Sequence, residues 1–203
     1  MSDEKIIQST ESPLNKTFQD KFYFIFELPE ALKNLQKRTV NGKSQLGIGK
    51  KPVQWSIIKA EVPNINIKAN AINYGGGTLH VSSHTKSPYD PFKLTFKVDS
   101  NWLNYYTIYE WINLIYNERE GHFDAENLAN DTKFSSYAIP VSIVGLDEYN
   151  NPTMQWIFTY AFPTDLSSIS MDYTSTEEIE FTATFVFSQM QIRNILYENL
   201  KDK

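Results

Sequence analysis

The sequence contains no cysteine, so disulfide bonds and thiolate metal sites are excluded and the fold must be stabilised by packing. It also lacks any apolar run near the roughly eighteen residues that a membrane-spanning helix needs, and its mean hydropathy is -0.42. No basic segment followed by an apolar one opens the chain, so no signal peptide is expected. These absences predict a soluble protein made in a reducing cytosol.

Basic residues are in the minority, because 19 Lys and Arg stand against 24 Asp and Glu and give a net charge of -5. Proteins that grip nucleic acid neutralise phosphates with clustered Lys and Arg. Tight DNA binding is therefore not expected.

Motifs of catalytic, metal and cofactor sites are also missing. The cluster Gly75–Gly77 opens no helix and lacks the lysine and hydroxyl of a phosphate loop, which favours a turn. His80 and His84 lie four residues apart, but in a strand-like stretch without a Glu signature, which favours surface histidines over a metal site. No serine has His and acid partners in a known motif, and nothing brings two carboxylates together. We expect no enzyme activity, no metal and no cofactor.

Aromatic residues are abundant, at 14% of the chain, and they favour pleated, half-buried strands. The C-terminal part of the pattern is the clearest, because Phe181, Ala183 and Phe185 alternate with Thr182 and Thr184. Segments of alternating apolar and polar residues, bounded by turns with glycine or proline, predict antiparallel strands. They are expected at residues 22–28, 53–62, 64–72, 78–82, 92–98, 137–144, 153–161 and 178–189.

One helix is predicted at about residues 101–118, where Asp99, Ser100 and Asn101 supply capping side chains. Its apolar stripe has three- and four-residue spacings and consists of Tyr105, Ile108, Ile112 and Ile115. A second apolar stripe, at Ile192, Ile195, Leu196 and Leu200, predicts a C-terminal helical tail too short to be stable alone.

The chain is expected to form one β domain with appendages. Residues 1–16 are polar and are expected to form a mobile N-terminal arm. We expect the β domain to span residues 17–191 and the helical tail to span residues 192–203. Residues 29–52 form a basic insert that is either a solvated loop or a contact with an acidic partner surface. Its basic residues are Lys33, Lys37, Arg38, Lys43, Lys50 and Lys51.

In the order and spacing of several motifs, the chain resembles the tail tube proteins of contractile-tailed bacteriophages, which are related in fold to type VI secretion tube proteins. The resemblance covers about Asn15 to Gln191 and departs from the family in the basic insert and the C-terminal tail. The motifs that carry it are Ile58–Pro63, Asn66–Ile72, Phe92–Val98, Tyr109–Trp111, Ala161–Leu166, Ile169–Tyr173 and Glu178–Phe185.

The resemblance implies a mostly β subunit, an antiparallel sandwich or barrel with one flanking helix. It further implies hexameric rings that stack into the hollow inner tube of a phage tail in the virion, the conduit for genome delivery. The implied partners are further copies of the chain, the tail sheath protein, the tape measure protein, the baseplate and tail terminator, and genomic DNA that passes without specific binding.

Candidate contact residues follow from exposed turns and basic segments. For ring stacking we select the turn residues and the basic insert, and for the lumen we select two threonines of the last strand. The stacking candidates are Lys37, Arg38, Lys43, Lys50, Lys51, Asn73, Tyr74, Gly75, Gly76 and Gly77, and the lumen candidates are Thr182 and Thr184. Two alternatives stay open: a tube initiator or tail completion ring of the same fold, and a β-sandwich carbohydrate-binding module whose exposed aromatics would stack on sugars.

Overall fold

The structure is a computed structural model that describes residues 16–29, 32, 39–40, 43–44, 53–54, 56–115 and 137–195. Antiparallel strands dominate these residues, which confirms the predicted fold class. The strands are β1 (Phe22–Phe26), β2 (Thr39–Val40), β3 (Lys43–Ser44), β4 (Ile57–Ala60), β5 (Ile67–Tyr74), β6 (Gly77–Lys86), β7 (Phe92–Lys97), β8 (Ile139–Leu146), β9 (Pro152–Leu166), β10 (Glu180–Val186) and β11 (Gln189–Asn194). Helix α4 spans Leu103–Ile115. No helix in the described part of the chain is long and apolar enough to cross a membrane.

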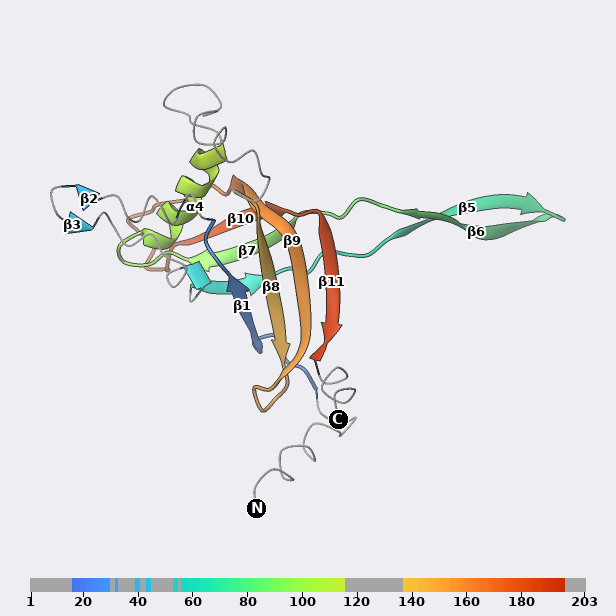
Figure 1. Cartoon of the computed structure of the whole chain (residues 1–203), viewed down its shortest axis with the longest axis horizontal. Coiled ribbons are helices and arrows are strands. Elements are labelled where there is room, and N and C mark those ends of the chain that lie inside the picture. The colour runs from blue at the N-terminus through green and yellow to red at the C-terminus, as the bar shows by residue number, and fades with distance from the viewer. Residues whose placement is uncertain are drawn as a thin grey trace, which may run out of the picture.

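A seven-stranded sheet forms the body, in the order β1-β8-β9-β10-β7-β4, with β11 also paired to β9. The 15-residue strand β9 joins its two halves. Its first part lies between β8 and β11, and its last residues pair with β10. Between these parts Tyr160 has a positive φ of 53°. The two halves cross at a steep angle in Figure 1, so their inner faces enclose the core.

The core is built from the alternating faces that the sequence predicts. Phe181, Ala183 and Phe185 of β10 are buried, whereas Thr182 and Thr184 between them are half-buried on the opposite face. Aromatic rings stack across the strands at centroid distances of about 5 Å. The core therefore closes by aromatic packing between the two halves of the sheet.

Helix α4 packs against this core through Trp111, which is 1% exposed and contacts Phe26 and Phe185. The indole N–H donates to the carbonyl oxygen of Tyr137 at 2.8 Å, so the polar edge of the ring is satisfied inside the protein. Asp99 caps the helix by accepting the backbone N–H of Leu103 at 2.8 Å. The predicted helix is thus confirmed over 103–115, and the residues from 116 to 136 lie outside the described residues.

The prediction of a C-terminal helix over residues 192–203 is wrong for its first residues, which the structure describes. Residues 189–194 form strand β11, and Met190 and Ile192 lie opposite Phe158 and Trp156 of β9. A free edge of β9 supplies a ladder of backbone hydrogen bonds, and this pairing outweighs the helical spacing of the apolar residues. Residues 196–203 lie outside the described residues.

Two other strand predictions need correction. The last predicted strand, 178–189, is interrupted after Val186 and continues as β11 on a different neighbour. The start of the predicted strand 53–62 is a helical turn at Val53 and Gln54, and β4 begins only at Ile57. Within the insert, the short pair β2 and β3 was not predicted. The N-terminal arm, apart from Lys16, and most of the insert lie outside the described residues.

Candidate assembly surfaces

Strands β5 and β6 form a long hairpin that projects far from the body and pairs with no other strand in the described part of the chain (Figure 1). Its strands are 8 and 10 residues long. Gly75 and Gly76 connect them with φ values of 58° and 83°, which suits a two-residue turn of the hairpin type. The predicted glycine turn is confirmed, but the second strand of the hairpin continues to Lys86, beyond its predicted end at residue 82.

One face of the long hairpin is apolar. Ile72 lies opposite Leu79, and Asn70 opposite Val81, so these side chains share a face with Tyr74 at the tip. The exposed fractions are 49% for Ile72, 79% for Tyr74 and 53% for Leu79. A two-stranded ribbon is marginally stable in water by itself. An apolar face in this position is suited to be covered by another molecule.

The base of the long hairpin is shaped by side chains that bond to the backbone. The register of β5 and β6 shifts near Lys68, and His84 adopts a positive φ of 55°. The Ser83 hydroxyl donates to the carbonyl oxygen of Lys68 at 2.7 Å, and the N–H of His84 donates to the Ser82 hydroxyl at 3.1 Å. These bonds hold a β-bulge that sets the direction of the hairpin.

A second surface is the solvent-facing side of β4, β7 and β10, opposite the core. Thr182 and Thr95 lie side by side there, with their hydroxyl oxygens 3.1 Å apart. Thr184 lies opposite Lys93 on β7 and Asp165 on β9. Thr182 and Thr184 therefore share one polar face of β10, as the alternation of apolar and polar residues predicts.

Two pairs of oppositely charged side chains lie at this surface. Lys59 Nζ lies 2.8 Å from the Glu61 carboxylate, and Lys97 pairs with Glu178. The hydrogen bond from Lys59 holds the pKa of Glu61 below its ordinary value, and the bond to Glu178 raises the pKa of Lys97. Glu61 and Lys97 therefore stay charged near neutral pH, and each lies beside a side chain of opposite sign.

The predicted stacking residues fall in two places. Asn73, Tyr74, Gly75, Gly76 and Gly77 lie together at the tip of the long hairpin. Lys43 lies in β3, far from that tip (Figure 1). The other stacking candidates lie outside the described residues, and they are Lys37, Arg38, Lys50 and Lys51.

Sequence reasoning missed two sets of exposed apolar residues. Ile72 and Leu79 could have been found from the alternation on both sides of the glycine turn. Met171 and Tyr173 lie in an irregular segment and are 72% and 110% exposed, although they alternate with polar residues as a strand would.

The two histidines in the described part of the chain belong to no metal-binding cluster. His80 and His84 both lie on β6 and are exposed. Among the residues that the structure describes, no group of three or more His, Cys, Asp or Glu side chains is placed to hold a metal ion.

The chain was compared with protein families, with curated proteins and with solved structures. A family model described as phage tail tube protein matches residues 17–193. The tube-terminating cap of the anti-feeding prophage is similar in structure, with a TM-score of 0.54, 17% identity, and coverage of 94% of this chain and 99% of that chain. A chain from the PVC extracellular contractile injection system, in its extended sheath–tube complex, has a TM-score of 0.52, 13% identity, and coverage of 96% and 100%. No curated protein matches the sequence significantly.

Proposed function

Because this chain belongs to the phage tail tube protein family, we propose that its copies form hexameric rings that stack into the hollow inner tube of a phage tail. The long hairpin is the observation that carries this proposal. It exposes Ile72, Tyr74 and Leu79 far from the body, where no other described segment of the same chain covers them. A second copy would bury this apolar face, and the gain is roughly 25 cal/mol for each Å² covered.

The tube would enclose a lumen lined by the polar face of β7 and β10, including Thr182 and Thr184. Uncharged hydroxyls and paired charges, such as Lys59 with Glu61, present few unpaired cations to a passing polyanion. The tape measure protein and later the genomic DNA would pass through this lumen without specific binding. We infer no catalytic role for the chain.

The outer partners follow from the same proposal. A tail sheath protein would surround the tube, and a baseplate and a terminator would close its two ends. The similar PVC chain comes from a sheath–tube complex, which supports this arrangement at the level of the fold. The protein would be made in the cytoplasm of the bacterial host and would reside in the virion tail.

A second candidate function is a ring that ends the tube. The observation behind it is the similarity to the tube-terminating cap of the anti-feeding prophage, which is matched as fully as the chain from the PVC sheath–tube complex. Such a protein would form one ring without stacking further.

Negative-stain electron microscopy of the full chain over a range of concentrations tests the proposal. We expect tubes with a central hole, and a variant with Gly-Gly in place of residues 67–86 should form rings that do not stack. The shortened chain should still fold, because the N–H of Ser87 donates to the carbonyl oxygen of Asn66 at 3.1 Å and already brings the two ends together. Single rings from the full chain would favour the terminating ring, and monomers at every concentration would refute assembly.

A further inference from the structure

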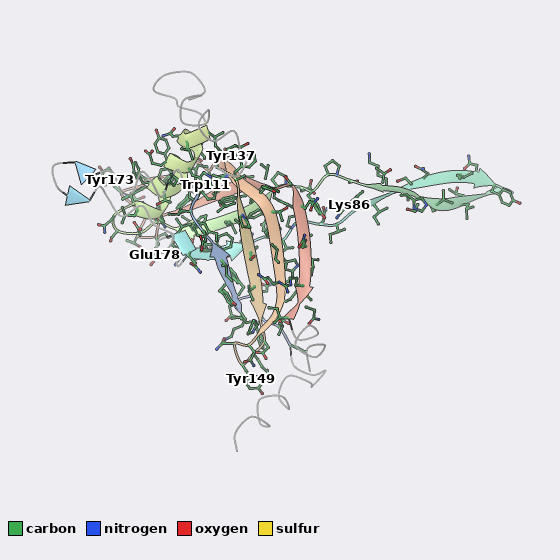
Figure 2. All side chains as sticks on the ribbon, viewed as in Figure 1. Lys86, Trp111, Tyr137, Tyr149, Tyr173 and Glu178 are labelled. Atoms are coloured by element: carbon green, nitrogen blue, oxygen red, sulfur yellow. The ribbon has the colours of Figure 1, made fainter. Side chains whose placement is uncertain are left out.

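The long hairpin is joined to the body by two stretches of irregular chain, which together form its neck. Residues 61–66 lead into β5 and residues 87–91 lead out of β6, and neither stretch lies in a strand. In Figure 2, Lys86 lies where the hairpin leaves the body. The eight residues of β5 span about 26 Å, so a rotation of about 20° at the neck would move the tip by about 9 Å. The position of the tip therefore depends on what holds the neck.

Proline makes the neck stiff. Pro63 lies in its first stretch, and Pro88 and Pro91 lie in its second. Each ring restricts its own φ to about −65°, and the residue before it favours extended conformations. The N–H of Ser87 donates to the carbonyl oxygen of Asn66 at 3.1 Å and ties the two stretches to each other. The two stretches therefore move together, and contacts with the body set their angle to it.

The neck is attached to the body on both of its stretches. On the first, the N–H of Glu61 donates to the carbonyl oxygen of Lys93 at 3.0 Å, which continues the pairing of β4 with β7. On the second, the ring of Tyr89 packs against that of Phe187, with centroids 5.1 Å apart. Phe187 packs in turn on Phe158, at 5.0 Å, and Phe158 is 0% exposed. Tyr89 therefore links the second stretch to the core.

The same tyrosine also contacts the hairpin. Lys86 is the last residue of β6, and its Nζ lies over the Tyr89 ring, 4.1 Å from the centroid. The ammonium group also donates to the Tyr89 hydroxyl. A cation in this position is attracted by the electrons of the aromatic face. Lys86, Tyr89 and Phe187 thus form a continuous link from hairpin to core, which we call the latch.

We propose that Tyr89 is a positioning residue, which holds the long hairpin at one angle to the body before the chain assembles. Without the latch, the neck would be attached only through the backbone of its first stretch, and the hairpin would swing about that attachment. A segment that is already ordered loses less entropy when a partner binds it. The angle is a property of the single chain, whereas its benefit for assembly rests on the proposed tube function.

Distances between spin labels test the latch directly, because no native cysteine competes for the label. Labels at Thr78→Cys, beside the tip, and at Tyr149→Cys, between β8 and β9, occupy exposed positions on the hairpin and the body. Pulsed electron paramagnetic resonance is recorded below the tube-forming concentration, with the labelled chain in an excess of unlabelled chain. The intact latch should give one narrow distance distribution. Tyr89→Ala should widen it about twofold or more, because the tip then samples the angles that the neck allows.

Matched variants separate the latch from a general loss of structure. Tyr89→Phe keeps the ring and should keep the narrow distribution, and Tyr173→Ala removes an exposed tyrosine elsewhere and should do the same. Lys86→Ala changes an exposed residue, so it leaves the core intact and should also widen the distribution. All four variants should keep the melting temperature of the labelled chain, because Tyr89 lies at the margin of the core. A narrow distribution in both alanine variants of the latch, or a broad one with the latch intact, would overturn the proposal.

Tube formation gives a second readout. Tyr89→Ala should raise the protein concentration at which tubes appear by about three- to tenfold, because the hairpin must then be ordered during assembly. Tyr89→Phe should restore the concentration that the unaltered chain needs. A wider distance distribution with an unchanged tube-forming concentration would refute the benefit of the latch for assembly. If the unaltered chain forms no tubes, the proposed function fails, and the spin-label distances still decide whether Tyr89 holds the hairpin.

Discussion

At the scale of single residues, Asp147 is the clearest determinant of stability. It is 7% exposed in the turn between β8 and β9, where its carboxylate accepts N–H groups of Tyr149 at 2.9 Å and Asn151 at 2.7 Å. The Asn151 side-chain amide donates at 3.0 Å as well. Asp147→Ala leaves these donors without their acceptor, so we expect a loss of about 1–3 kcal/mol in the free energy of unfolding, measured by urea denaturation. An unchanged urea midpoint would contradict this role of the carboxylate.

The same residue predicts a dependence on pH. Burial raises the pKa of Asp147, but hydrogen bonds from Asn151 and Tyr149 outweigh it and hold the pKa below the ordinary value of 3.8. A lowered folded pKa adds stability above the unfolded pKa, and this stability is lost as pH falls through the folded pKa. Asp147→Asn keeps one acceptor oxygen but cannot ionise. Its deficit in unfolding free energy should be present at about pH 7 and shrink below about pH 4; a deficit that is constant with pH would exclude the charge as its cause.

At the scale of elements, strand β9 bends where it passes from one half of the sheet to the other. Tyr160 occupies the bend with a φ of 53°, a conformation that is especially unfavourable for a β-branched residue. Tyr160→Val should therefore lower the free energy of unfolding by about 1–3 kcal/mol. Tyr160→Gly removes the same side chain but permits the angle, so it should be the more stable of the two in thermal unfolding. Equal melting temperatures would show that the bend is not strained.

The turn of the long hairpin is a second element whose geometry depends on glycine. A side chain at Gly75 meets no atom within 4 Å, so only its φ of 58° restricts substitution. Gly75→Asn should be tolerated, because Asn visits this region, whereas Gly75→Val should not. We expect the Val variant to raise the concentration at which tubes form by about tenfold, the effect of about 1.4 kcal/mol. Both variants should melt as the unaltered chain does, because the turn is remote from the core.

An element can be predicted from the sequence when one of its faces is buried and the other is exposed. The two faces of strand β10 could be predicted residue by residue, because its apolar residues, such as Phe181, are buried and its polar residues, such as Thr182, are more exposed. The second strand of the long hairpin was predicted too short, at 78–82, because eight of the ten residues of β6 are exposed and exposed strands have a weak pattern. Strand β11 was predicted as a helix because its extended conformation depends on pairing with β9, a long-range contact that the local sequence does not reveal.

The candidate site shows the same limit. Its glycine turn is a local feature, and the sequence predicts it together with Tyr74. A pocket beside Trp102 is lined by residues from two distant segments, 97–102 and 178–179, and no spacing in the sequence predicts that these segments meet. The positive φ of Trp102 depends on the Asp99 bonds around it and is equally invisible to sequence patterns.

At the scale of the whole molecule, the proposed tube depends on the long hairpin that each copy extends from its body (Figure 1). A copy that lacks residues 67–86 keeps the body but has no hairpin to offer the next ring. Mixed with the full chain, it should add to a growing tube and end it, so mean tube length should fall as its fraction rises. Electron micrographs of mixtures at fixed total concentration measure this length. A matched control is the full chain with Gly75→Asn, which keeps the hairpin and should leave the tube length unchanged. If the shortened chain leaves tube length unchanged at every fraction, stacking does not depend on the long hairpin.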